Sequence, residues 1–86
     1  MRLLYHREFE KEAQDLPVAT RRKLERLLPI IVENPFHSLL HTKPLTGDLR
    51  GKYSFRITRD WRVSFVFLEE DVVYLLSVKH RKDIYR

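Results

Sequence analysis

The sequence contains no cysteine. Neither a disulfide nor a cysteine-ligated zinc ion can therefore stabilise this protein or take part in its chemistry. No apolar run approaches the roughly 20 residues that a membrane-spanning helix needs, and the N-terminal segment becomes charged at Arg7, too early for the apolar core of a signal peptide. These absences predict a cytoplasmic protein without a membrane partner.

The histidines offer little for metal binding. His37 and His41 are four residues apart, a spacing that on a helix could hold a metal ion. No glutamate or third ligand stands nearby, and Pro44 and Gly47 mark the segment as a loop. We therefore expect neither a metal nor a cofactor.

Length and charge set the next limits. A chain of 86 residues predicts one domain, residues 1–86, and its 43% apolar residues suffice for one core. The net charge is +5, and residues 50–62 carry five basic side chains against one acidic side chain. Such a basic excess is typical of proteins that bind a polyanion, most often nucleic acid, although a solvated basic surface would have the same composition.

Helical periodicity follows a short strand predicted at residues 3–6. Phe9 and Leu16 fall on one face of a helix that ends at Pro17. A second amphipathic segment begins after this proline and ends near Asn34, which precedes another proline. The short joint between the two helices predicts an antiparallel αα-hairpin.

Three later segments are predicted to be strands. Residues 53–58 and 61–67 alternate apolar and polar residues with the period of a strand, and residues 72–78 form an apolar run after an acidic turn. The resulting order β-α-α-β-β-β predicts an α+β fold, an antiparallel twisted sheet with the αα-hairpin packed on one face.

The apolar pattern also predicts the strand register, because directly paired residues share a face of the sheet. Short turns at residues 58–60 and 70–71 place Ser64 opposite Ser77, and Phe67 opposite Tyr74. The same register pairs Phe65 with Leu76. All the aromatic side chains of these pairs then face the helices.

The opposite face of the predicted sheet is basic at one end. Arg56 lies opposite Arg62, Arg62 lies opposite Lys79, and Arg81 follows with the same alternation. Like charges that face each other destabilise a sheet by up to about 1 kcal/mol a pair. A bound anion would relieve this repulsion; alternatively, the arginines extend into solvent or pair with aspartates from neighbouring loops.

At its other end the same face would expose apolar side chains. Such a patch indicates either a docked protein segment or cover by a loop. The residues concerned are Val66, Leu68, Val73 and Leu75.

Three motifs resemble those of one protein family. They are Trp-Arg-Val at residues 61–63, His-Arg-Lys-Asp-Ile-Tyr at residues 80–85 and Leu-Thr-Gly at residues 45–47. Together with the element order, they resemble the RelE/ParE superfamily of bacterial toxins from type II toxin–antitoxin pairs. The resemblance covers nearly the whole chain.

The resemblance implies a small toxin that a RelB-like antitoxin wraps and neutralises. Members of the RelE branch cleave mRNA in the ribosomal A site, whereas members of the ParE branch poison DNA gyrase without nuclease activity. We expect a ribosome-dependent mRNA endoribonuclease that cleaves through the 2′-hydroxyl and inhibits translation, with mRNA and ribosomal RNA as partners. The alternatives are a gyrase poison and a plain RNA-binding protein.

By matched position, the resemblance assigns Arg62, Arg81 and Tyr85 to the catalytic site. Arg56 keeps one of two basic positions on the second predicted strand, and Ser54 stands at the other. Arginines suit a phosphorane because they stay charged and bind phosphate oxygens in pairs.

Cleavage also requires a base and an acid, and the sequence offers His80 or Tyr85 for these roles. The sequence does not decide between the two. Further basic residues are expected to contact RNA phosphates: Lys43, Arg50, Lys52, Arg59, Lys79 and Lys82.

Overall fold

The protein is described by a computed structural model for residues 1–84. The α+β class and the predicted order of helices and strands are confirmed, with a two-residue strand and two 3-10 turns added in the predicted loop. The elements are β1 (Arg2–Tyr5), α1 (Arg7–Gln14), α2 (Val18–Glu33), η1 (Ser38–Leu40), β2 (Lys43–Pro44), η2 (Gly47–Leu49), β3 (Tyr53–Arg56), β4 (Trp61–Glu69) and β5 (Val72–His80).

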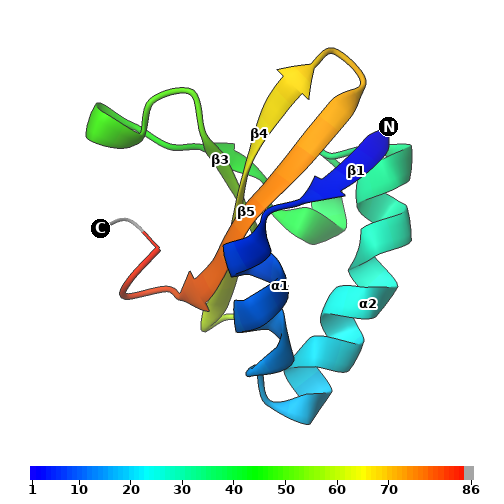
Figure 1. Cartoon of the computed structure of the whole chain (residues 1–86), viewed down its shortest axis with the longest axis vertical. Coiled ribbons are helices and arrows are strands. Elements are labelled where there is room, and N and C mark those ends of the chain that lie inside the picture. The colour runs from blue at the N-terminus through cyan, green and yellow to red at the C-terminus, as the bar shows by residue number, and fades with distance from the viewer. Residues whose placement is uncertain (85–86) are drawn as a thin grey trace.

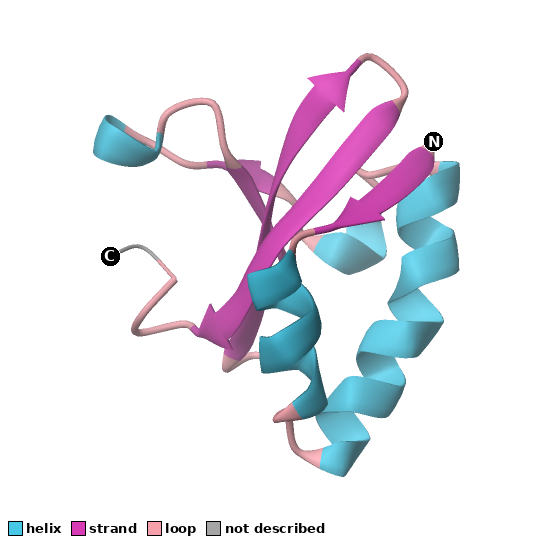
Figure 2. Ribbon diagram, in the orientation of Figure 1, coloured by secondary structure: helices cyan, strands magenta, loops and turns pink. Residues whose placement is uncertain are grey.

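The five strands form one sheet in the order β1-β5-β4-β3-β2. The pairs β3–β4 and β4–β5 are antiparallel as predicted, and the added strand β2 is antiparallel to β3. Strand β1 runs parallel to β5, which makes the sheet mixed. A parallel pair needs a long connection, and here the two helices and three intervening strands supply it. Both helices lie on one side of the sheet, and the segments carrying η2 and residues 81–84 lie on the other (Figures 1 and 2).

The core lies between the helices and the sheet. Phe9 of α1 and Leu24, Leu27 and Ile31 of α2 turn towards it, as the helical periodicity predicts. From the sheet, Phe55 and its neighbours on β4 and β5 complete one continuous apolar cluster. In residues 1–84, neither helix combines the length and apolarity required to cross a membrane.

The β4–β5 pairing contains two irregularities that compensate each other. Ser64 faces Ser77 as predicted, but Leu76 is left without a partner, so Phe65 faces Leu75. A second irregularity near the end of β4 restores the original register before the turn. The predicted register is therefore confirmed at both ends of the hairpin and wrong in its middle.

Between the two irregularities, the side chains of β5 change face. Phe67 faces Val73 rather than Tyr74. Val73 and Leu75 are each 0% exposed and belong to the core. The prediction that Val73 and Leu75 lie on an exposed docking patch is wrong, because one extra residue in a strand reverses its alternation.

Glu12 of α1 covers the edge of β5 beyond the end of β1. The last bond from the β1 side is donated by His6 N–H to Leu75 O, at 2.8 Å. Farther along, the Glu12 carboxylate accepts from the Val78 N–H at 3.2 Å and from Lys79 Nζ at 2.7 Å. One side chain thus pairs an edge amide and attaches α1 to the sheet.

Substitutions to alanine test the bulged register. Leu75→Ala should lower the free energy of unfolding by about 2–5 kcal/mol, because it leaves a cavity in the core. Leu68→Ala should cost less than about 0.5 kcal/mol, because Leu68 is 53% exposed. Urea unfolding followed by circular dichroism measures both. Similar small losses would mean that Leu75 is exposed, as regular alternation requires.

Substitutions of Glu12 separate its two contacts. Glu12→Ala leaves the Val78 N–H unpaired and should cost about 1–2 kcal/mol of unfolding free energy. Glu12→Gln keeps an acceptor for this amide and loses only the ion pair with Lys79, so it should cost less than about 1 kcal/mol. Amide hydrogen exchange at Val78 should accelerate in Glu12→Ala alone. Equal exchange in both variants would contradict the edge-pairing role.

Candidate nucleic-acid interface

The sheet face turned away from the helices, called the open face below, has a floor of serines. Ser54, Ser64 and Ser77 lie side by side on β3, β4 and β5. The Ser64 and Ser77 hydroxyls are 2.7 Å apart and hydrogen-bonded, and Ser54 is only 1% exposed. A hollow lies over Ser64 and Ser77, where the side chains are small. The η2 segment and residues 81–84 lie on this side of the sheet (Figure 2).

Beside the serines, three cations form the predicted row across the strands. Arg56 faces Arg62, and Arg62 faces Lys79. Arg62 Nη1 donates to two backbone carbonyls of the preceding turn, Thr58 O at 2.7 Å and Arg59 O at 2.8 Å. The repulsion within the row is therefore eased partly by carbonyl dipoles, and the guanidinium is held in a fixed position.

Arg81 reaches the same turn from the other side. Its backbone N–H donates to Asp60 O at 2.7 Å, and its Nε lies 3.6 Å from Asp60 Oδ1. Asp60 is thus one of the loop aspartates expected to pair with an arginine. Arg62 and Arg81, which the resemblance assigns to catalysis, converge on the turn at residues 58–60.

Lys79 forms an ion pair with Glu12 of α1. Its hydrogen bond to the Glu12 carboxylate, together with the charge of that group, raises the pKa of Lys79 against the opposing effect of partial burial. The ion pair stabilises the fold fully below the unfolded-state pKa of lysine, about 10.4, and this contribution is lost as the pH rises through the folded-state pKa. Lys79 is therefore charged at neutral pH but already paired.

Arg56 also borders a second hollow, at the outer edge of β3. Lys23 of α2 and Arg59 of the turn line this hollow of about 350 Å³, together with Leu39 and His41 from the segment around η1. Basic side chains therefore continue from the row around the edge of the sheet to Lys23 of α2.

His80 lies on the helix side of the sheet. It faces Trp61, with ring centroids 5.6 Å apart, and its Nδ1 accepts from the Lys82 N–H. Leu16 from the end of α1 lines the same hollow as both rings. The structure thus places His80 apart from the serine floor, whereas Tyr85 lies outside the described residues.

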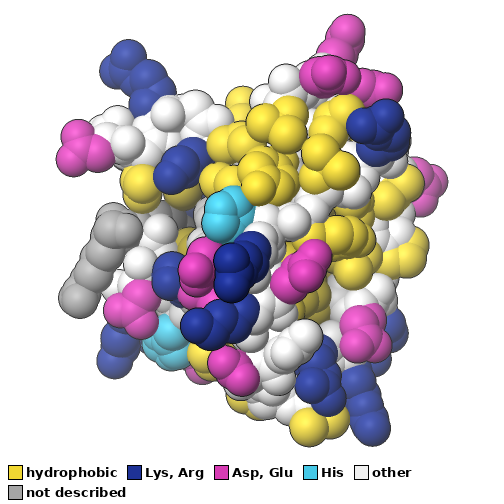
Figure 3. Space-filling view, viewed as in Figure 1, with side chains coloured by type: hydrophobic (Ala, Val, Ile, Leu, Met, Phe, Trp, Pro, Cys, Tyr) yellow, Lys and Arg dark blue, Asp and Glu magenta, His cyan; other side chains and the backbone are white. Residues whose placement is uncertain are grey.

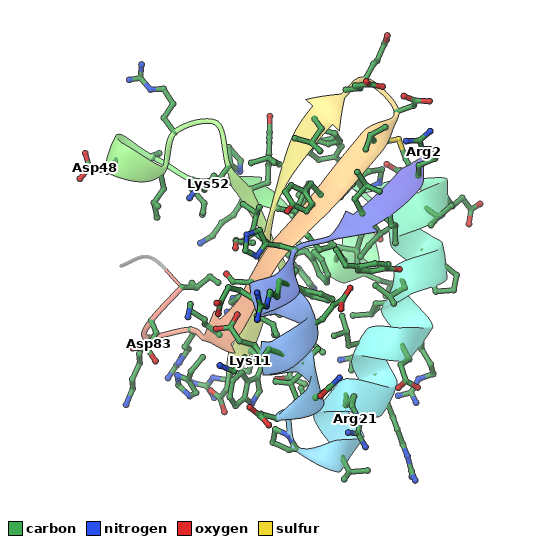
Figure 4. The ribbon with its side chains drawn as sticks, viewed as in Figure 1. Arg2, Lys11, Arg21, Asp48, Lys52 and Asp83 are labelled. Carbon is green, nitrogen blue, oxygen red and sulfur yellow. The ribbon has the colours of Figure 1, made fainter. Side chains whose placement is uncertain are left out.

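Sequence reasoning missed His6. The parallel pairing of β1 with β5 brings this residue next to the open face, where it lines a hollow of about 300 Å³ with Lys52, Ser64 and Ser77. Lys52 precedes β3 and extends towards this hollow from the opposite side (Figure 4). No motif marks His6; only knowledge of the parallel pairing could have located it.

The remaining predicted phosphate contacts are exposed around the open face. Lys43 lies in β2, Arg50 follows η2, Arg59 lies in the β3–β4 turn and Lys82 follows β5. Within residues 1–84, no three histidine, aspartate or glutamate side chains are arranged to hold a metal ion.

An apolar area continues the open face towards the β4–β5 turn. Leu4 faces Tyr74, and Tyr74 faces Val66, so a second row crosses three strands. Leu4 is 40% exposed and Leu68 is 53% exposed. Figure 3 shows apolar side chains gathered over this upper part of the molecule and charged ones below it. We define the apolar area as Leu4, Val66, Leu68, Tyr74 and Leu76.

Comparison with known proteins gives matches in structure only. No protein-family model and no curated protein matches the sequence. A YoeB/ParE toxin from Agrobacterium tumefaciens superimposes with a TM-score of 0.79 and 21% identity, over 94% of this chain and 99% of that chain. YafQ from Escherichia coli gives 0.76 and 18%, over 100% of both chains.

An archaeal RelE, solved in a RelE–RelB complex from Pyrococcus horikoshii, gives a TM-score of 0.75 and 27% identity, over 95% of this chain and 96% of that chain. These proteins share the α+β architecture along their full lengths. The chain therefore has the fold of the RelE/ParE superfamily of toxins.

Proposed function

We propose that the protein is the toxin of a type II toxin–antitoxin pair and that it cleaves mRNA on the ribosome. The observation that carries the proposal is the convergence of Arg62 and Arg81 on one turn, at the end of the strands that also carry the serine floor. Such a site accepts a phosphodiester and supplies fixed positive charge to it.

The proposed reaction is an internal transesterification. The 2′-oxygen of one nucleotide attacks the adjacent phosphorus and gives its proton to a base, while the bond from phosphorus to the 5′-oxygen breaks and that oxygen takes a proton from an acid. The products are a 2′,3′-cyclic phosphate and a 5′-hydroxyl. Arg62 and Arg81 stabilise the extra negative charge on the phosphorane oxygens, which is where fixed donors accelerate such a step most.

Arg62 is prepared for this role by the turn. Two carbonyls hold its Nη1, so less side-chain freedom remains to be lost when the other N–H groups bind phosphate. Of the two candidates for proton transfer, His80 is separated from the open face by the sheet itself. We therefore assign the role of the base to Tyr85, and this assignment rests on the family resemblance.

An antitoxin of the RelB or YefM type is the proposed protein partner. RelE of Methanococcus jannaschii and YoeB of Staphylococcus aureus, which share this fold, were solved in complexes with RelB and YefM. In this chain the apolar area offers exposed and half-buried side chains on the same face as the basic row, beyond the serine floor. A segment with apolar residues followed by acidic ones would cover both parts of the open face.

Expression of the protein should halt growth and produce codon-phased cuts in mRNA. Arg81→Gln should reduce cleavage about 10²- to 10³-fold, as loss of one donor to a developing oxyanion does. Its fold should persist, since Arg81 forms only an exposed pair with Asp60. Primer extension on cellular mRNA measures the cuts.

Arg22→Gln in α2 is the matched control, because it removes the same charge from an exposed position away from the open face. It should cleave like the wild type. Harmless overexpression of the folded wild-type protein would contradict the toxin proposal. Growth arrest with intact messages and stalled replication would replace the nuclease with a gyrase poison.

The docking surface is tested by placing a charge in the apolar area. Leu68→Lys should weaken antitoxin binding at least about tenfold, because a lysine must be desolvated at the interface. Val18→Lys is the control, since Val18 is equally exposed, at 53%, but lies at the start of α2. Calorimetric titration with purified antitoxin measures both. Equal affinities would place the antitoxin elsewhere.

A further inference from the structure

We propose that His6 and Lys52 bind one phosphate of the RNA strand in the hollow between α1 and the serine floor. Within residues 1–84, this hollow brings together side chains from four separate segments, and no motif of the family resemblance includes His6. The inference deepens the proposed function and rests on it for the identity of the ligand as RNA.

The hydrogen bonds of His6 determine which nitrogen carries its proton. His6 is the N-cap of α1, and its Nδ1 accepts from the Glu8 N–H at 2.9 Å. In the neutral ring the proton is then on Nε2. The ring also lies against Tyr74, with centroids 5.7 Å apart. His6 therefore presents a fixed N–H donor at the hollow, suited to hold a phosphate oxygen rather than to accept a proton.

Lys52 supplies the available cation. The other lysine of the hollow, Lys79, is paired with Glu12. Lys52 makes no ion pair with another residue of the range 1–84. One unpaired lysine and one neutral imidazole match a single phosphate, and the volume of about 300 Å³ lies at the lower end of small-ligand sites.

The wall opposite Lys52 favours a nucleotide over an acidic protein segment. Glu8 and Glu12 of α1 line this wall. Their carboxylates repel any anion, a phosphate as much as the carboxylate of an acidic peptide, but a nucleotide also carries ribose hydroxyls that donate hydrogen bonds to them. The serine hydroxyls of the floor can form hydrogen bonds with either a sugar or a phosphate.

The experiment uses the full chain and a trinucleotide of RNA whose central 2′-hydroxyl is methylated, so that cleavage cannot occur. His6→Asn is the decisive variant, because asparagine is among the best N-cap residues and keeps the helix start while removing the Nε2 donor. Its melting temperature should stay unchanged, and its affinity for the trinucleotide should fall about 10- to 100-fold. Arg22→Gln should bind like the wild type.

Salt dependence distinguishes the two side chains. Lys52→Gln should reduce the slope of log K against log salt by about 0.7, because one phosphate charge is no longer neutralised. His6→Asn should leave the slope unchanged, because a neutral donor displaces no counterion. An equal loss of slope in His6→Asn would show an imidazolium and overturn the assignment of a neutral donor. An ¹⁵N spectrum of the imidazole checks this directly, with Nε2 protonated and Nδ1 unprotonated before and after binding.

Unchanged affinity in both His6→Asn and Lys52→Gln would overturn the inference, and mRNA cleavage by the wild type would still uphold the proposed function. Conversely, a wild type that binds the trinucleotide through His6 yet leaves cellular mRNA intact would refute the nuclease and keep the site. Variants that lose affinity for the purified antitoxin but not for RNA would identify the hollow as an antitoxin contact and overturn the inference.

Discussion

The pairing of β4 with β5 is the constraint on which the rest of the molecule depends. This central pair carries two of the three floor serines, most of the basic row and five of the thirteen buried residues of the core cluster. Its two compensating irregularities keep Ser64 opposite Ser77 while turning Val73 and Leu75 towards the helices. A regular ladder would align one of these regions only by misplacing the other, since alternation along a strand has a period of two.

The cations of the open face are paired with groups from neighbouring turns and from α1, not with acidic side chains that alternate with them along the strands. Three cations of the open face have three different kinds of partner: backbone carbonyls for Arg62, an aspartate for Arg81 and a glutamate from α1 for Lys79. None of these arrangements cancels the positive charge of the arginines' remaining donors. The face is thus stable enough to fold and retains binding capacity for an anion.

Periodicity was sufficient to predict the helices, the strands β3, β4 and β5 and the arginine pairs, because each depends on near neighbours or on tight turns. It predicted a short strand at residues 3–6 but not its parallel pairing with β5, which lies about seventy residues away along the chain. The bulge at Leu76 was equally hidden, since Leu75 and Leu76 are chemically alike and either satisfies an apolar pattern. These two features together explain why His6 was missed and why Val73 and Leu75 were misplaced.

Glu12 and His6 show that α1 belongs to the site as much as to the core. One forms the edge contact with β5, and the other begins the helix beside the serine floor.

Both parts of the open face are carried by the same strand, with Tyr74 in the apolar row and Lys79 in the basic row. Five residues of a strand rise roughly 17 Å. A single partner segment that covers both rows must therefore contain about five residues if extended, or about eleven if helical. A shorter segment reaches one row only, and leaves either the arginines or the apolar side chains in contact with water.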